Sequence, residues 1–221
     1  MGTKGGRVRV GAYPGTFDPP TVAHLAVAEA ALNQGGLDAV HLVLSRSPLG
    51  KSPSVPSFED RVSVLESVAA SRPWLSVRVT DRRLIAEVAA GYDAVIMGMD
   101  KWLQVIDPAW YGGLYAGRDA AVRSLPEVLL AVREGSANPG PLPAGVRLLD
   151  VHPAHGPVSS SLVRAGRVEW MLEEAARFDA RTGAWSDPAR YVAEVAAEGA
   201  ATDGRGPASL RPMPGPDPAH G

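Results

Sequence analysis

Short apolar runs alternate with stretches of helical periodicity along most of the chain. The runs at 39–45 (AVHLVLS) and 92–97 (YDAVIM) are almost continuously apolar, which is typical of strands buried on both faces of a sheet. In 57–72, by contrast, apolar residues recur at helical spacing. Strand and helix alternate four times in this way, and the alternation predicts a parallel sheet with helices on both faces.

The predicted fold is α/β and Rossmann-like: a doubly wound parallel sheet of five to six strands, followed by a helical C-terminal region. Asp81 is expected to cap a helix that ends at Gly91, and Gly98 is expected to begin a loop. Ligands bind such sheets beyond the carboxyl ends of the strands, so the loops at that edge form the candidate site. The expected strands are 7–11, 39–45, 74–80, 92–97, 128–132 and 146–151.

The length and composition predict one domain followed by a tail. A chain of 221 residues with 45% hydrophobic content can bury one good-sized core, which we assign to residues 1–198. Residues 199–221 consist largely of Gly, Pro and Ala, with hardly an apolar anchor. We expect this tail to be disordered, because nothing in it offsets the entropy of ordering.

Charge and cysteine content exclude several classes of protein. The net charge of −2, with Lys and Arg thinly spread, argues against a nucleic-acid-binding protein. The chain has no cysteine, which excludes disulfides, a thiolate nucleophile and a cysteine-based zinc site. No signal-peptide pattern and no apolar run of membrane-spanning length is found. We expect a cytoplasmic protein with small-molecule substrates and no membrane partner, and homo-oligomers stay open.

The first candidate anion site follows the first predicted strand. Gly15 allows the backbone to approach a ligand, two prolines stiffen the turn, and the next helix presents unpaired N–H groups at its positive end. Thr21 and His24 are three residues apart, so they share one face of that helix. They can therefore present a hydroxyl and an imidazole to one anion. The alternative is that both residues simply cap an ordinary helix.

The second candidate anion site lies at 158–164 (VSSSLVR). Ser159 is a natural N-cap, Ser160 and Ser161 add hydroxyl groups, and Arg164 projects from the first turn. The alternative is a serine-capped surface helix with a solvated arginine.

Together the two motifs resemble the signatures of the nucleotidylyltransferase superfamily. GTFDPPTVAH at 15–24 is similar to the T/HxGH motif, with Ala23 in place of a glycine, and VSSSLVR is similar to ISSSxxR. The resemblance implies in-line attack of an acceptor phosphate on the α-phosphorus of a nucleoside triphosphate, with release of pyrophosphate. It also implies Mg²⁺, which accompanies the triphosphate, although no acidic pair in the sequence identifies a metal site.

The resemblance also implies roles for individual residues. His24, with Thr21 beside it, would contact the transferring phosphoryl group, and Arg164 would hold the outer phosphates. Lys51, on the loop that follows the second strand, matches a family lysine near the acceptor phosphate. The implied nucleotide-binding residues are Gly15, Thr16, Phe17, Asp100, Ser159, Ser160 and Ser161, and the acceptor-binding residues are Trp110 and Arg46.

Within the superfamily, the pattern is similar to nicotinate mononucleotide and phosphopantetheine adenylyltransferases. GMD at 98–100 and a later tryptophan resemble the first group, which implies that Asp100 holds a ribose hydroxyl and Trp110 stacks on a pyridine ring. A tryptophan that only packs is the alternative. YPGTFDPPT at 13–21 resembles the second group, whose arginine-bearing segment is absent here. A cytidylyltransferase, and a non-catalytic nucleotide-binding protein suggested by Ala23, stay open.

Overall fold

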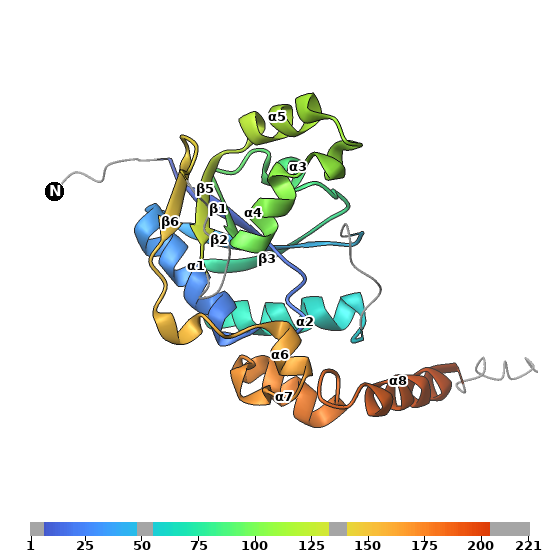
Figure 1. The fold of residues 1–221 in the computed structure, drawn as a ribbon. Helices are drawn as coiled ribbons and strands as arrows, with labels where there is room; N and C mark the ends of the chain where they lie inside the picture. Colours follow the sequence, from blue (N-terminus) through green and yellow to red (C-terminus); the bar gives the residue numbers. More distant parts are fainter. Residues whose placement is uncertain (1–6, 48–54, 133–140, 204–221) are drawn as a thin grey trace, which may run out of the picture.

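The computed structural model describes residues 7–47, 55–132 and 141–203, with side chains up to residue 197. Six parallel strands form one sheet in the order β3-β2-β1-β4-β5-β6 (Figure 1). The chain builds outward from β1 to β3, returns, and continues from β4 to β6. This confirms the predicted doubly wound sheet. The strands are β1 (Val10–Pro14), β2 (Ala39–Ser45), β3 (Leu75–Thr80), β4 (Ala94–Gly98), β5 (Glu127–Ala131) and β6 (Val146–Leu149).

Helices cover both faces of the sheet, as the alternating pattern predicts (Figure 1). α1 and α2 pack on one face, and α3, α4 and α5 pack on the other. In β4, Ile96 joins the first core and Met97 the second, because neighbouring side chains of a strand point to opposite faces. The helices are α1 (Val22–Gly35), α2 (Phe58–Ala70), α3 (Ile85–Ala89), α4 (Met99–Ile106), α5 (Tyr115–Ser124) and the 3-10 helix η1 (Pro108–Tyr111).

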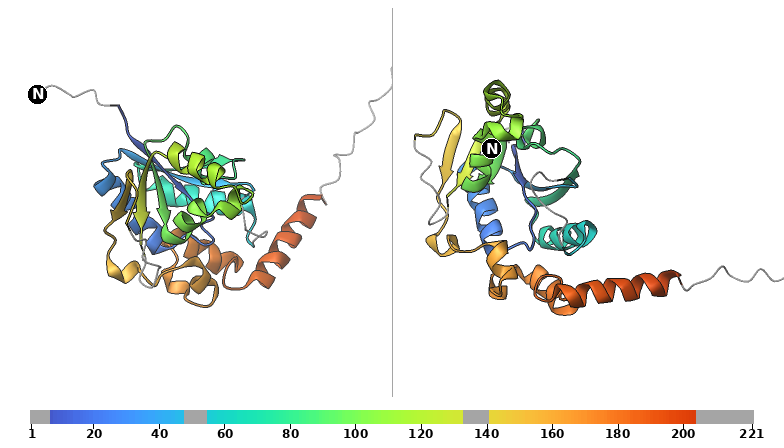
Figure 2. Two further views of the ribbon diagram at one scale, coloured as in Figure 1. Left: turned by 45° about the horizontal axis from the view of Figure 1, so that its top comes forward. Right: turned by 45° about the vertical axis from the view of Figure 1, so that its right-hand side comes forward.

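The C-terminal region packs against α2 through a core of its own, which gathers around Trp185 and includes Val64 of α2. Its elements are η2 (Pro153–His155), α6 (Ser160–Arg164), η3 (Val168–Trp170), α7 (Glu173–Thr182) and α8 (Pro188–Asp203). α8 extends away from the rest of the molecule in each view (Figure 2) and enters the stretch predicted to be disordered. The rest of that stretch, 204–221, lies outside the described residues. None of the described helices is long and apolar enough to cross a membrane.

Three predicted element starts are wrong by two to four residues, including that of the strand predicted at 92–97, which begins at Ala94. The first strand begins at Val10 rather than at residue 7, and it runs directly into the first motif. Asp81 caps no helix, because α3 begins only at Ile85. The carboxylate of Glu87 accepts the main-chain N–H of Leu84 at 3.2 Å and so fixes the start of α3 from within the helix.

The segment after β4 is a helix and not the predicted loop. α4 begins directly after Gly98, and its buried side chains are Met99, Trp102 and Val105. These residues recur every third position on one face of the helix, where they pack against the sheet. Their spacing is a sequence signal that outweighs the loop character of the glycine and aspartate at its start.

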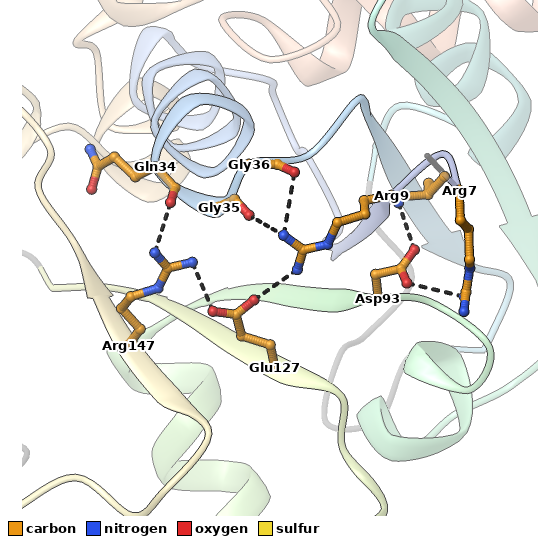
Figure 3. Close-up of polar contacts among 9 residues, drawn as sticks. Arg7, Arg9, Gln34, Gly35, Gly36, Asp93, Glu127 and Arg147 are labelled. Carbon is orange, nitrogen blue, oxygen red and sulfur yellow. Dashed lines mark hydrogen bonds and ion pairs between the residues drawn. The ribbon is translucent and has the colours of Figure 1, made fainter. Parts of the chain in front are cut away.

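Ion pairs close the amino edge of the sheet, where the strands begin (Figure 3). Glu127 at the start of β5 lies between two guanidinium groups, Arg9 at 3.1 Å and Arg147 at 2.7 Å. The same arginines donate to carbonyls at the end of α1, Arg9 to Gly35 and Arg147 to Gln34, both at 2.8 Å. Positive charge there complements the negative end of the helix dipole. The amino edge thus anchors the C-terminal end of α1.

Candidate active site

A cleft of about 280 Å³ lies beyond the carboxyl ends of β1, β2 and β4, at the reversal of strand order where doubly wound sheets bind ligands. Its walls come from the turn between β1 and α1, the end of β2, the segment that enters α3, α4 and η1. Of the predicted site residues, the cleft brings together Gly15, Thr16, Phe17, His24, Asp100 and Trp110.

The turn between β1 and α1 is shaped by the ring of Phe17. A Cβ atom at Gly15 would lie 2.8 Å from this ring, so only glycine leaves room for it. Phe17 itself has a φ of 45°, a conformation that bulky residues adopt only when their surroundings impose it. Gly15 is therefore needed for the packing of the turn, a reason that the sequence does not reveal.

His24 projects from the first turn of α1 and is oriented by Thr21. Its Nδ1 accepts the main-chain N–H of Thr21 at 3.0 Å and lies 2.8 Å from the Thr21 hydroxyl. A neutral ring whose Nδ1 accepts a hydrogen bond carries its proton on Nε2. The ring also packs edge to face against Phe17, with the centroids 5.2 Å apart. His24 is thereby prepared to donate a hydrogen bond in a fixed direction.

Thr21 has a different place from the expected one. Thr21 is fully buried, with 0% of its surface exposed, and it does not line the cleft. Its hydroxyl contacts His24 rather than facing an anion. The side chain therefore orients the imidazole in this structure, and its predicted contact with the anion stays a prediction.

The peptide between Thr16 and Phe17 has a defined orientation. The carbonyl of Thr16 accepts a hydrogen bond from Arg61 of α2 at 3.2 Å. In a trans peptide the N–H points opposite to the C=O, so the N–H of Phe17 points away from Arg61. Within the described residues, this N–H and that of Thr16 have no hydrogen-bond acceptor. Both residues line the cleft, so their N–H groups can meet an anion there.

The second motif contacts this turn and does not line the cleft. Ser159 caps α6 as predicted, accepting the N–H of Leu162 at 3.2 Å. The hydroxyl of Ser160 donates to the carbonyl of Pro19 at 2.8 Å.

Arg164, from the same motif, reaches the turn through Asp18. Its guanidinium hydrogen-bonds the main-chain oxygen of Asp18 and lies 3.6 Å from the Asp18 carboxylate. A second guanidinium nitrogen lies 3.5 Å from the Ser161 hydroxyl. The predicted contact of Ser159, Ser160, Ser161 and Arg164 with the outer phosphates stays a prediction, since all four residues here contact the protein.

The opposite wall is formed by α4 and η1. Asp100 is exposed at the start of α4, and Trp110 is half-buried; both line the cleft. Trp102, by contrast, is only 3% exposed and belongs to the core. Tyr111 donates its hydroxyl to the carbonyl of Val105 at 3.0 Å, and burial raises the pKa of that hydroxyl. This wall combines an aromatic face with one carboxylate.

Two cations in the cleft are missed by the sequence analysis. Arg83 is exposed and lines the cleft, and its guanidinium has no partner among the described residues. Lys101 lines the same wall and donates to the side chain of Gln104 at 2.9 Å. An available signal is the Arg82–Arg83 pair, which follows β3 after Asp81 at the binding edge. With Asp100 as the acidic residue of the described lining, these cations favour an anionic ligand.

The two remaining predicted residues lie elsewhere. Arg46 is exposed after β2, 3.6 Å from Glu59 and 3.9 Å from Asp81, with its guanidinium 4.9 Å from the ring centroid of Phe58. It is not part of the cleft lining as described. Lys51 lies outside the described residues.

Ala23, which replaces the expected glycine, is 4% exposed within α1 and does not line the cleft. Its methyl group is therefore packed inside the protein and leaves the cleft open.

The described lining of the cleft offers few side chains that could ligate a metal ion. Among the described residues, no group of three His, Asp or Glu side chains could hold one. Mg²⁺ at nucleotide sites is commonly bound by phosphate oxygens and one or two carboxylates. The single carboxylate of Asp100 in the cleft fits that mode of binding, in which the triphosphate supplies most ligands.

Comparisons with known proteins agree with this geometry. A sequence model described as cytidylyltransferase-like matches residues 12–166, more than half of the chain. Similar curated proteins are probable nicotinate-nucleotide adenylyltransferases of Bordetella pertussis, 38% identical over 72 residues, and Laribacter hongkongensis, 30% identical over 93 residues. These matches cover 33% and 42% of this chain but only 36% and 41% of the relatives. The chain thus spans less than half the length of the curated relatives it matches.

A similar solved structure is the Plasmodium falciparum nicotinic acid mononucleotide adenylyltransferase complexed with NaAD. The TM-score is 0.57, with 13% sequence identity, over 81% of this chain and 98% of that chain. At this identity the likeness shows a shared fold.

Proposed function

The chain belongs to the cytidylyltransferase-like family, and from this premise we propose that it transfers AMP from ATP to nicotinate mononucleotide. The observation that carries this proposal is the pairing of an oriented imidazole with an aromatic wall across one cleft. The names of the curated relatives support the choice of acceptor. The acceptor phosphate oxygen bonds to the α-phosphorus as the bond to the β-phosphate breaks, and pyrophosphate leaves.

The residues near α1 supply positioning and charge stabilisation, which are the main needs of this reaction. His24 donates from Nε2 to an oxygen of the α-phosphoryl group, where negative charge grows in the transition state. The N–H groups of Thr16 and Phe17 and the positive end of α1 lie beside it. Thr21 keeps the imidazole in the required tautomer through its bond to Nδ1.

The wall formed by α4 and η1 receives the acceptor. Trp110 offers an aromatic face to the pyridine ring, and Asp100 accepts a hydrogen bond from a ribose hydroxyl. Arg83 and Lys101 place positive charge beside the phosphates of the bound substrates. Asp100 is also the residue that could ligate Mg²⁺, which supplies charge neutralisation at the phosphate oxygens when bound.

A pyrophosphate-release assay tests the proposal by crossing two triphosphates, ATP and CTP, with four kinds of acceptor. The acceptors are nicotinate mononucleotide, nicotinamide mononucleotide, phosphopantetheine and simple sugar or alcohol phosphates, with Mg²⁺ present throughout. We expect the highest rate for ATP with nicotinate mononucleotide, and His24→Ala is the inactive control. A preference for phosphopantetheine, or for CTP, would replace the proposed substrates. Nucleotide binding without release from any pair would contradict a catalytic role, and Ala23→Gly would then test whether the methyl group is the cause.

A further inference from the structure

The turn before α1 is held from outside at almost every residue. Its carbonyl oxygens accept hydrogen bonds from three parts of the chain: α2, α6 and the residues that precede α7. The accepting oxygens and their donors are Thr16 with Arg61, Asp18 with Arg164, Pro19 with Ser160 and Pro20 with the N–H of Leu172. The Thr16 carbonyl shares its peptide with the N–H of Phe17, which therefore points away from Arg61. The other three carbonyls fix the backbone of the turn itself, since Pro19 and Pro20 have no N–H and the N–H of Thr21 donates to His24.

One further contact comes from the C-terminal region. The indole Nε1–H of Trp185 donates to the carboxylate Oδ1 of Asp18 at 2.7 Å. Both residues are buried, with Trp185 1% and Asp18 8% exposed. The other carboxylate oxygen lies 3.6 Å from Arg164. The Asp18 carboxylate is therefore held by a hydrogen bond from Trp185 and by an ion pair with Arg164.

The position of Trp185 is itself well defined. Its main-chain N–H donates to Asp179 of α7 at 2.6 Å, and its ring packs against Phe178 with the centroids 5.8 Å apart. Trp185 thus connects the C-terminal core directly to the residue that follows Phe17, whose φ of 45° needs a rigid environment. The family match covers residues 12–166, so it includes Asp18 but not Trp185.

We propose that Trp185 is a positioning residue of the nucleotide site: through Asp18 it holds the N–H groups of Thr16 and Phe17 toward the cleft. The inference rests on the proposed function. Removing the indole N–H leaves a buried carboxylate oxygen without its donor, and Asp18 then shifts toward Arg164. The shift turns the neighbouring peptide and misplaces groups that act on the transferring phosphate.

The kinetic test uses Trp185→Phe, which keeps an aromatic ring and removes the N–H. Small misplacements at a reacting centre cost up to about a hundredfold, so we expect kcat to fall between about tenfold and a hundredfold. The KM of each substrate should change by less than about threefold, which separates positioning from loss of binding. Trp170→Phe, in the same C-terminal core, is the matched control and should keep kcat. An unchanged kcat in folded Trp185→Phe overturns the inference.

A second measurement does not depend on turnover. Amide NMR resonances of Thr16 and Phe17 are recorded before and after addition of ATP, in the wild type and in both tryptophan variants. We expect Trp185→Phe to displace these resonances and to reduce their response to ATP, whereas Trp170→Phe leaves them unchanged. Identical resonances and responses in the wild type and Trp185→Phe overturn the inference. Absence of pyrophosphate release from the wild type contradicts the proposed function instead, and the amide data then decide the role of Trp185.

Discussion

The two edges of the sheet carry similar charged side chains in opposite arrangements. At the amino edge, Arg9 and Arg147 both form ion pairs with Glu127 and donate hydrogen bonds to carbonyls at the end of α1 (Figure 3). At the carboxyl edge, Arg83 lines an open cleft and has no partner among the described residues. Charges that satisfy one another hold the fold together, whereas a charge that faces a cleft can bind a ligand.

A single helix connects the two edges. α1 presents His24 and its positive end to the cleft, and its C-terminal carbonyls are held by Arg9 and Arg147 at the amino edge. The amino edge should therefore determine stability and the carboxyl edge activity. Variants at each edge test this separation.

The largest effect is expected from His24→Ala. This change removes a donor to the transferring phosphoryl group, and the loss of one such contact lowers kcat by about a hundredfold or more. The melting temperature should fall by only a few degrees, because the change leaves the buried Thr21 N–H and hydroxyl without their partner but keeps the core intact. His155→Ala, in η2 and outside the cleft lining, is the matched control. Turnover of purified His24→Ala close to wild type would remove the residue from the mechanism.

The next effect concerns the aromatic wall. Trp110→Ala should raise the KM of the acceptor about tenfold, as expected if stacking on a ring contributes roughly 1–3 kcal/mol. The KM of ATP should stay near its original value, and Trp110→Phe should recover most of the loss because it keeps a ring. Steady-state kinetics with each substrate varied in turn provide the test. An equal rise in both KM values would assign Trp110 to packing.

These edges differ in how far the sequence predicts them. The strands and both motifs follow from local patterns, since each apolar run and each capping residue acts within a few neighbouring positions. The place of Arg83 in the cleft is not predicted, because the residues after β3 also resemble the start of a helix. The burial of Thr21 and the contact of Trp185 with Asp18 depend on chain segments far apart in sequence. No local pattern encodes such contacts.

At the amino edge, Glu127→Gln should lower stability by about 1 kcal/mol, because partly exposed pairs contribute little singly and more as a network. For a domain of this size, that corresponds to roughly 2–4 °C in melting temperature. The kinetic constants should not change, since the residue lies at the opposite edge from the cleft. Glu169→Gln, which affects an exposed pair with Arg167, is the control and should have a smaller effect. A fall in kcat for Glu127→Gln would show that the edges are coupled through α1.

The smallest effect should be that of salt on the difference in stability between the wild type and Glu127→Gln. The side chains of Arg9, Glu127 and Arg147 are 41%, 30% and 46% exposed, so water and ions reach the network. The screening length falls from about 10 Å at 0.1 M salt to about 3 Å at 1 M. The stability difference between wild type and Glu127→Gln, measured by urea unfolding, should therefore shrink by a few tenths of a kcal/mol at high salt. Glu127 also accepts a hydrogen bond from Arg9 at 3.1 Å and lies 2.7 Å from Arg147, and these short-range contacts resist screening. A difference that vanishes at 1 M salt would show that long-range charge, and not these bonds, anchors the amino edge.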